Sequence, residues 1–275
     1  MSLLEIKNLS VNNLRTGQQI IHDLSFSLHE NRCLCIVGES GSGKSMTAKA
    51  ILGLTSPWLQ VNGEVLFKGM NLIEQSNATM RKVRGQKICM ILQDAMTAFD
   101  PLSTIGKQMI ETLRENLVMN KTEAKELAIT ALQSVQIYEP EQVLKKYPHQ
   151  LSGGMLQRVM ISIVMVIKPD IIIADEPTTA LDSINQREVV EQFKKLLAVN
   201  HVSMIFISHD LSVVQYLADD VLVMKDGKCV ELGEASKILS TPSHSFTKFL
   251  IDTRVGLSQS FQQSMSGGEA IVLES

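Results

Sequence analysis

The sequence predicts an α/β fold, built on a mainly parallel sheet with a helical insertion in its middle. Short apolar runs of strand character alternate with helical patterns near both ends of the chain. Between about residues 95 and 165 the pattern is helical and has no strand signal. A glycine-rich loop joins one buried strand to a helix. Strands that alternate with helices are typical of parallel sheets, because parallel neighbours need a crossover connection.

The first third of the chain contains the strand and the helix that flank this loop. Residues 20–28 alternate between apolar and polar side chains, which is typical of a half-buried strand. Residues 33–37 form a continuous apolar run, which indicates a fully buried strand, and a helical pattern follows at 45–54. Two further short strands are expected at 63–67 and 88–92.

The middle of the chain is expected to form the helical insertion. Apolar residues recur at helical spacing from 105 to 137, and Asn120 followed by Glu123 is a typical helix start. The elements expected after the insertion are a strand at 171–174, a helix at 184–197, a strand at 204–207 and a hairpin across 221–232 that turns at Asp226-Gly227. Beyond residue 253 the chain is rich in Ser, Gln and Gly, which predicts a flexible tail.

The composition is that of a globular protein and argues against several other classes. The 275 residues include 26 Lys and Arg against 29 Asp and Glu, and this net charge of −3 gives no electrostatic reason to expect nucleic-acid binding. The longest apolar run, 159–167, is far shorter than the ~20 residues of a membrane-spanning helix, and residues 1–5 lack a signal-peptide pattern. The four cysteines, at positions 33, 35, 89 and 229, are expected as buried thiols in a reducing compartment.

The glycine-rich loop is the most specific motif in the chain. Residues 38–45 match G-x-x-x-x-G-K-[ST] between a buried strand and a helix, which is the context that this motif requires. Its backbone N–H groups would surround phosphate oxygens, while Lys44 would reach the β- and γ-phosphates and the Ser45 hydroxyl would be a Mg²⁺ ligand. The loop predicts nucleotide binding through Gly38, Glu39, Ser40, Gly41, Ser42, Gly43, Lys44 and Ser45.

Two adjacent acids, Asp175 and Glu176, follow the strand expected at 171–174. Ligands bind at the carboxyl edge of an open parallel sheet, so both acids are expected beside the phosphate loop. Asp175 suits a Mg²⁺ ligand, and Glu176 suits a general base that polarises the attacking water.

A second candidate anion site lies at Leu151-Ser152-Gly153-Gly154-Met155, where a helical stretch begins. Two phosphate-binding helix starts in one protein suggest that two chains close on each other's nucleotide. At this point the sequence resembles the ABC ATPases, whose signature Leu-Ser-Gly-Gly-Gln appears here with Met155 in the final position. The resemblance covers residues 3 to about 252.

The resemblance implies further site residues. Gln93 matches the family's glutamine loop, which senses Mg²⁺ and water and links to the membrane partner. Asp182 matches the loop that faces the opposite subunit, and His209 matches the switch histidine that contacts the γ-phosphate. The implied catalytic residues are Glu176, His209, Gln93 and Lys44; the implied Mg²⁺ ligands are Ser45, Gln93 and Asp175; and Ser152, Gly153, Gly154 and Asp182 join the phosphate loop in binding ATP.

The resemblance also implies an architecture and an assembly. The fold would be a P-loop ABC ATPase cassette, with an antiparallel β subdomain beside the mainly parallel sheet and a helical subdomain at about 95–165. The ATPase domain would span 1–252 and the tail 253–275. The implied cofactors are ATP and Mg²⁺. The implied partners are two membrane-spanning permease subunits, a second homologous ATPase subunit in a heterodimer or a homodimer, and an extracytoplasmic solute-binding protein, which would place the chain peripherally at the cytoplasmic face of the inner membrane.

Three segments resemble the peptide/nickel importer branch of this family: 94–101, 151–158 and 241–248. Many peptide-importing members extend further and carry a cysteine cluster, whereas no cysteine follows Cys229 here. This favours import of nickel or a metal-chelate (opine-type) complex, with dipeptide or oligopeptide import as the alternative. An ABC ATPase that acts outside transport is less favoured, because such proteins usually carry two cassettes or a long coiled-coil insertion.

One position departs from the family pattern. Members usually stack adenine on an aromatic residue near positions 12 to 14, where this chain has Asn12-Asn13-Leu14, and no aromatic residue precedes Phe26. Aliphatic contact alone is therefore expected for the base, which puts base selectivity in question.

Overall fold

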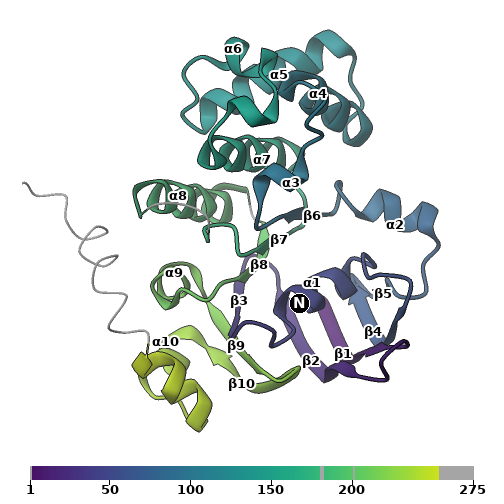
Figure 1. Ribbon diagram of the computed structural model, residues 1–275, viewed down its shortest axis with the longest axis vertical. Helices are drawn as coiled ribbons and strands as arrows, with labels where there is room; N and C mark the ends of the chain where they lie inside the picture. The colour runs from purple at the N-terminus through teal and green to yellow at the C-terminus, as the bar shows by residue number, and fades with distance from the viewer. Residues whose placement is uncertain (1, 180–182, 201, 254–275) are drawn as a thin grey trace, which may run out of the picture.

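The computed structural model describes residues 2–179, 183–200 and 202–253. Across these ranges the chain forms a six-stranded sheet and a four-stranded sheet, and a group of helices, α3 to α7, stands at one end of the molecule (Figure 1). The predicted α/β class, with a mainly parallel sheet and an antiparallel one, is confirmed.

The six-stranded sheet has the order β10-β9-β3-β8-β7-β6. Its neighbours are parallel except β9 and β10, which form an antiparallel hairpin. The strands are β3 (Cys33–Gly38), β6 (Ile88–Ile91), β7 (Ile171–Asp175), β8 (Ser203–Ile207), β9 (Asp220–Lys225) and β10 (Lys228–Glu234). Asp226 and Gly227 form the turn with φ of 48° and 75°, so the expected Asp-Gly hairpin is confirmed.

Strand β3 lies between two hydrophobic cores and contributes to both. Cys33 and Cys35 belong to the core that the sheet shares with the helical group, whereas Leu34 and Ile36 belong to the core that includes the four-stranded sheet. All six residues of the strand are buried. Coverage on both faces explains why the sequence of this strand is continuously apolar and why it was predicted correctly.

The four-stranded sheet is antiparallel, in the order β2-β1-β4-β5. Its strands are β1 (Ser2–Asn13), β2 (Gln19–His29), β4 (Leu59–Phe67) and β5 (Met70–Asn71). Strand β1 was not predicted, and β4 begins at residue 59 instead of the expected 63. In β1 the register shifts around Asn8, which has a φ of 49°, so the alternation of apolar and polar residues is broken in mid-strand.

The helical group contains two helices where the spacing at 105–137 suggested a single pattern. Asn120 begins the second of them, since its Oδ1 accepts hydrogen bonds from the N–H groups of Thr122 (2.9 Å) and Glu123 (3.1 Å), as its spacing to Glu123 predicted. The group comprises α3 (Ala95–Ala98), α4 (Ile105–Asn116), α5 (Lys121–Ser134), α6 (Pro140–Lys145), a short 3₁₀ helix (Pro148–Gln150) and α7 (Gly153–Ile167).

The remaining helices connect and cover the strands. They are α1 (Lys44–Ile51), α2 (Asn77–Val83), α8 (Ser183–Asn200), α9 (Leu211–Leu217) and α10 (Ala235–Ser240), followed by helical residues 245–253. Helix α1 ends before the expected Leu54 because the chain turns at Gly53, whose φ is 59°. The expected helix at 184–197 is confirmed as α8. None of the helices in the described ranges has the length and apolar character of a membrane span.

The importer-type segment 241–248 is anchored to strand β10 by Glu231. The Ser243 N–H and hydroxyl donate to Glu231 Oε1 at 2.8 and 2.6 Å, and the His244 N–H donates to Oε2 at 3.1 Å. Burial favours the neutral carboxyl, but these hydrogen bonds outweigh it and lower the pKa of Glu231 to about 2. The segment therefore has a structural function here, since it holds the helix at 245–253 against the sheet.

Candidate nucleotide-binding site

The phosphate loop connects the carboxyl end of β3 to the N-terminus of α1, as predicted. Glycine is required at its first position, because Gly38 has a φ of 155° and a Cβ there would lie 2.2 Å from the backbone oxygen of Met224. Gly43 caps α1 with a φ of 101° and without a side-chain hydrogen bond. The cap residue thus supplies no side-chain acceptor at this helix N-terminus, which is a position suited to an anion.

The Lys44 side chain folds back over this loop. Its Nζ donates to the backbone oxygens of Gly38 (3.1 Å) and Glu39 (2.8 Å), and the residue is 5% exposed. Carbonyl oxygens compensate for part of the desolvation of this buried charge. A phosphate bound in the loop would place a full negative charge next to the Lys44 ammonium group and would stabilise it further.

Ser45 and Asp175 lie side by side, although 130 residues separate them. The Ser45 hydroxyl donates to Asp175 Oδ1 at 2.7 Å, and Asp175 is 6% exposed at the end of β7. Burial raises the pKa of Asp175 and the charge of Glu176 raises it further, while the hydrogen bond from Ser45 opposes the rise. A buried carboxylate beside a hydroxyl fits Mg²⁺, which prefers hard oxygen ligands and would compensate for the desolvation.

Glu176 continues from β7 into a turn and contacts His209. Its φ of 46° directs the chain away from the strand, and its Oε2 lies 3.3 Å from His209 Nδ1 and accepts a 3.1 Å hydrogen bond from the Thr179 hydroxyl. The backbone N–H of Glu176 donates to the oxygen of Ile207 at 3.0 Å. Adjacent parallel strands β7 and β8 thus deliver the two predicted catalytic residues to one place.

Gln93 follows β6 at the same edge of the sheet. Ile91 of β6 pairs with Ala174 of β7, so Gln93 and Glu176 each lie two residues beyond a paired position. The Gln93 side chain is exposed. Strands β3, β6, β7 and β8 therefore bring the predicted residues of the ATPase site to one edge of the sheet, at or just beyond their carboxyl ends: Lys44, Ser45, Gln93, Asp175, Glu176 and His209.

The signature segment forms the start of α7. Ser152 caps this helix, with its Oγ accepting from the Met155 N–H at 3.3 Å, and both Ser152 and Gly153 are exposed whereas Gly154 is buried. A Cβ on Gly153 would meet nothing within 4 Å. The helix start is therefore open to an outside group. Asp182, the other residue expected to face a second chain, lies outside the described residues.

The hairpin between β1 and β2 carries Leu14 at the last of the positions where an aromatic residue was expected, and Arg15 follows it. The Arg15 guanidinium stacks over the Trp58 ring, 4.4 Å from its centroid, and the Leu14 N–H donates to the Trp58 oxygen at 2.9 Å. The absence of an aromatic residue in residues 12–14 thus does not leave this loop without one, because Trp58 approaches from the start of β4. Trp58 was not predicted at this loop because it lies far from residues 12–14 in the sequence.

A second contact, which the sequence did not predict, supports the phosphate loop. The N–H of Gly227, in the turn between β9 and β10, donates to the Ser42 oxygen at 3.1 Å, and the Gly227 oxygen accepts from the His22 N–H at 2.9 Å. The hairpin turn therefore bridges strand β2 and the phosphate loop. In the sequence, Asp226-Gly227 predicts a turn but does not indicate which segments the turn contacts.

Replacement of Gly227 by alanine is expected to weaken ATP binding and to lower the unfolding temperature. The new Cβ would lie 2.2 Å from the Ile20 oxygen at a φ of 75°, a conformation that costs an L-residue at least about 1–2 kcal/mol. Gly233→Ala is the matched control on β10, because its Cβ would meet only Ile238 at 3.5 Å. Titration calorimetry and thermal unfolding measure both effects, and equal behaviour of the two variants would contradict the support of the loop by Gly227.

A phosphate loop and acidic residues at the carboxyl edge of a parallel sheet define a P-loop nucleotide hydrolase. Within that class the chain belongs to the ABC transporter family, whose pattern matches residues 21–179. Membership makes the chain an ATP-binding, ATP-hydrolysing subunit of a transporter.

Named relatives agree with this assignment. The metal-staphylopine import system ATP-binding protein CntD of Staphylococcus aureus is 42% identical over 267 residues, which cover 97% of this chain and 98% of that protein. The dipeptide transport ATP-binding protein DppD of Bacillus subtilis is 43% identical over 253 residues, or 90% of this chain and 76% of that protein. A dimeric ATP-binding cassette solved in a post-hydrolysis state with ADP and phosphate superposes with a TM-score of 0.75 at 26% identity, covering 84% of this chain and 98% of that one.

Proposed function

We propose that this chain is the ATPase subunit that powers uptake of nickel or a metal-chelate complex through separate membrane subunits. The observation that carries the proposal is the similarity to the metal-staphylopine import ATPase, which extends over nearly all of that relative. Dipeptide or oligopeptide import is the second candidate, favoured by the 43% identity to the dipeptide transport ATPase. Substrate selection lies in other subunits, so the ATPase site itself does not separate the two.

In the proposed reaction the chain's own residues position ATP and activate water. Lys44 and the phosphate-loop N–H groups bind the phosphates, while Ser45, Asp175 and Gln93 would hold Mg²⁺, which supplies charge neutralisation on the phosphate oxygens when bound. Glu176 accepts the proton of the attacking water. His209, whose Nδ1 lies 3.3 Å from Glu176 Oε2, would help to orient this carboxylate next to the γ-phosphate.

A second ATPase chain completes each site in this proposal. Ser152, Gly153 and Gly154 at the start of α7 would bind the γ-phosphate held by the partner, as would the loop that contains Asp182. Exposure of Ser152 and Gly153 supports this arrangement. The ATPase domain would comprise residues 1–252, with 95–165 as its helical subdomain and 253–275 as a tail.

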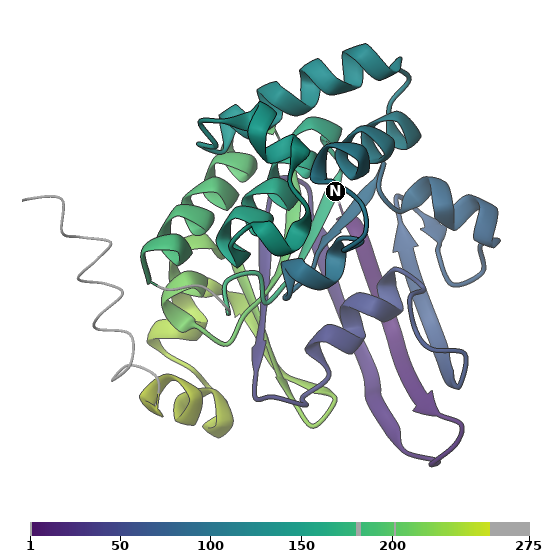
Figure 2. The same ribbon diagram turned by 45° about the horizontal axis from the view of Figure 1, so that its top comes forward.

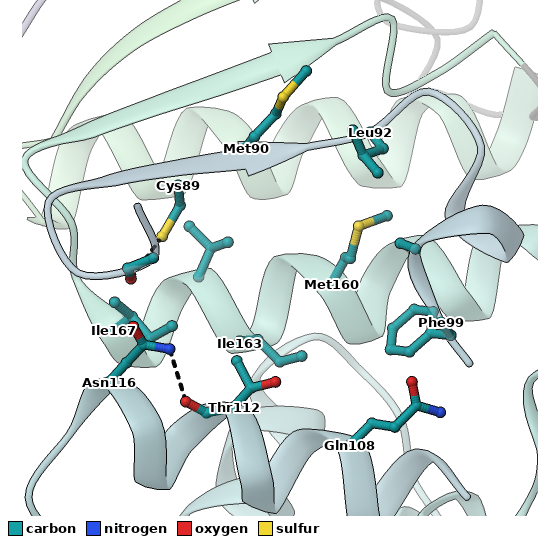
Figure 3. Close-up of a pocket in the computed structure, with 13 residues that line it drawn as sticks. Cys89, Met90, Leu92, Phe99, Gln108, Thr112, Asn116, Met160, Ile163 and Ile167 are labelled. Carbon is teal, nitrogen blue, oxygen red and sulfur yellow. Dashed lines mark hydrogen bonds between the residues drawn. The ribbon is translucent and has the colours of Figure 1, made fainter. Parts of the chain in front are cut away.

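The membrane subunits are proposed to dock in a groove that lies beside Gln93. A cavity of about 350 Å³ lies between β6, α4 and α7 (Figure 3), and its walls include Leu92, Phe99, Thr112 and Met160. Its mixed apolar and polar lining fits a cytoplasmic helix of a permease. Docking at this position would connect transport to the glutamine loop and place the chain at the cytoplasmic face of the inner membrane, in a complex that also uses an extracytoplasmic solute-binding protein.

Deletion and complementation test the proposed substrate. In cells that lack this chain, accumulation of radiolabelled nickel supplied with a chelator should fall, while accumulation of a labelled dipeptide should be unchanged. Wild-type chain should restore uptake, and Glu176→Gln should not. Loss of dipeptide uptake alone would replace the metal-chelate proposal by the peptide one. Unchanged uptake of both, with normal amounts of the complex, would refute both import proposals.

A further inference from the structure

A basic cavity lies in the helical group, away from the nucleotide site. It has a volume of about 590 Å³ and opens between α4, α5 and α6. Figures 1 and 2 show these helices beyond α7, which lies between them and the six-stranded sheet. The floor contains Gly106, Ile110 and Leu144, which are buried or half-buried, and the rim is charged. This volume is within the range of small-ligand sites.

Five cations and two acids form the rim. They are Lys107, Arg114, Lys121, Lys125, Lys145, Glu111 and Glu141. In the part of the chain that the structure describes, none of these cations forms an ion pair within 4.0 Å. The cavity thus carries a net charge of +3 in a chain whose net charge is −3. Asp100, on the loop before α4, also contributes negative charge near Lys107.

Helix electrostatics explain only some of these cations. Arg114 and Lys145 lie in the last turns of α4 and α6, where positive charge stabilises a helix. Lys121 is the first residue of α5 and Lys107 the third residue of α4, so both lie at the positive ends of helix dipoles. Lys125 lies one turn beyond Lys121 on the same helix. Lys121 and Lys125 therefore repel each other, and an anion between them would relieve this repulsion.

We propose that this cavity binds a multiply charged phosphate group. Lysines and one arginine from three helices can surround its oxygens, and the apolar floor fits the carbon portion of an organic phosphate or of a phospholipid headgroup. The two acids at the rim oppose anion binding, but the five cations leave the cavity with a net positive charge. The site lies outside the ATPase machinery, so it does not depend on the proposed transport substrate.

The rate of lysine acetylation, measured by mass spectrometry with and without an added anion, tests this site residue by residue. The full chain is first saturated with ADP in the absence of Mg²⁺, so that the phosphate loop is filled, and is then titrated with inorganic pyrophosphate. Acetylation of Lys107, Lys121 and Lys125 should slow by about tenfold, because an anion holds and shields their ammonium groups. The exposed lysines Lys82, Lys237 and Lys248 are internal controls and should change by less than about twofold, since isolated surface charges are screened by salt.

A second arm identifies the source of the phosphate. Vesicles of phosphatidylglycerol and phosphatidylcholine in equal parts are sedimented with the wild type and with a variant carrying Lys107→Gln, Lys121→Gln and Lys125→Gln. Co-sedimentation that the variant loses, at an unchanged unfolding temperature, assigns the site to lipid headgroups; pyrophosphate protection without vesicle binding assigns it to soluble phosphates. Equal protection of both lysine sets, or no effect of either probe, would overturn the proposal.

Discussion

Replacement of Glu176 by glutamine is expected to lower the turnover number of the assembled transporter by about 10²–10⁴, with little change in ATP affinity. The amide retains an oxygen that can accept the hydrogen bond now donated by the Thr179 hydroxyl, and it keeps the size of the side chain beside His209, so the turn after β7 should keep its geometry. An amide cannot accept the proton of the attacking water. ATPase assays and equilibrium binding of ATP separate the two effects.

Two further measurements make this prediction specific. With ATP bound and hydrolysis blocked, Glu176→Gln should accumulate as a closed dimer with its partner ATPase in size-exclusion chromatography, whereas the wild type should not. Glu64→Gln applies the same chemical change to an exposed residue of β4 and should retain wild-type turnover. Wild-type turnover in Glu176→Gln would remove this residue as the general base.

The predictable part of the site has local sequence signals. The phosphate loop could be identified because its glycines and Lys44 all lie within the single segment 38–45. Asp175 and Glu176 could be identified because they directly follow the apolar run 171–174. A parallel sheet places the carboxyl ends of its strands at one edge, so motifs on separate strands were expected to meet there. The 2.7 Å contact between Ser45 and Asp175 confirms this expectation for two residues far apart in the chain.

The unpredicted part depends on tertiary contacts or on irregular backbone. The Ser42–Gly227 hydrogen bond and the Arg15–Trp58 stack join segments that have no common motif. Strand β1 was missed because a register shift near Asn8 disrupts its period of two. The lysines of the basic cavity are ordinary surface residues in the sequence, and only the packing of α4, α5 and α6 brings them together.

Replacement of Lys44 by alanine is expected to weaken ATP binding by about tenfold to a hundredfold, since a hydrogen bond to a charged group contributes ~1.5–3 kcal/mol. The lysine is 5% exposed and lies directly over the loop, so its charge acts on the phosphates with little screening by water. Lys82→Ala removes an exposed charge in the last turn of α2 and is the matched control. Equilibrium titration with a fluorescent ATP analogue compares the two variants.

The nucleotide-free stability of the Lys44 variant adds an independent test of the same geometry. In the absence of ATP, Lys44 Nζ donates to the oxygens of Gly38 and Glu39, so alanine removes both hydrogen bonds within the loop. The same substitution also removes a buried charge whose desolvation opposes folding, and the two effects partly cancel. A small change in unfolding free energy together with a large loss of ATP affinity is therefore expected. A large stability loss with unchanged affinity would mean that Lys44 serves only to hold the loop together.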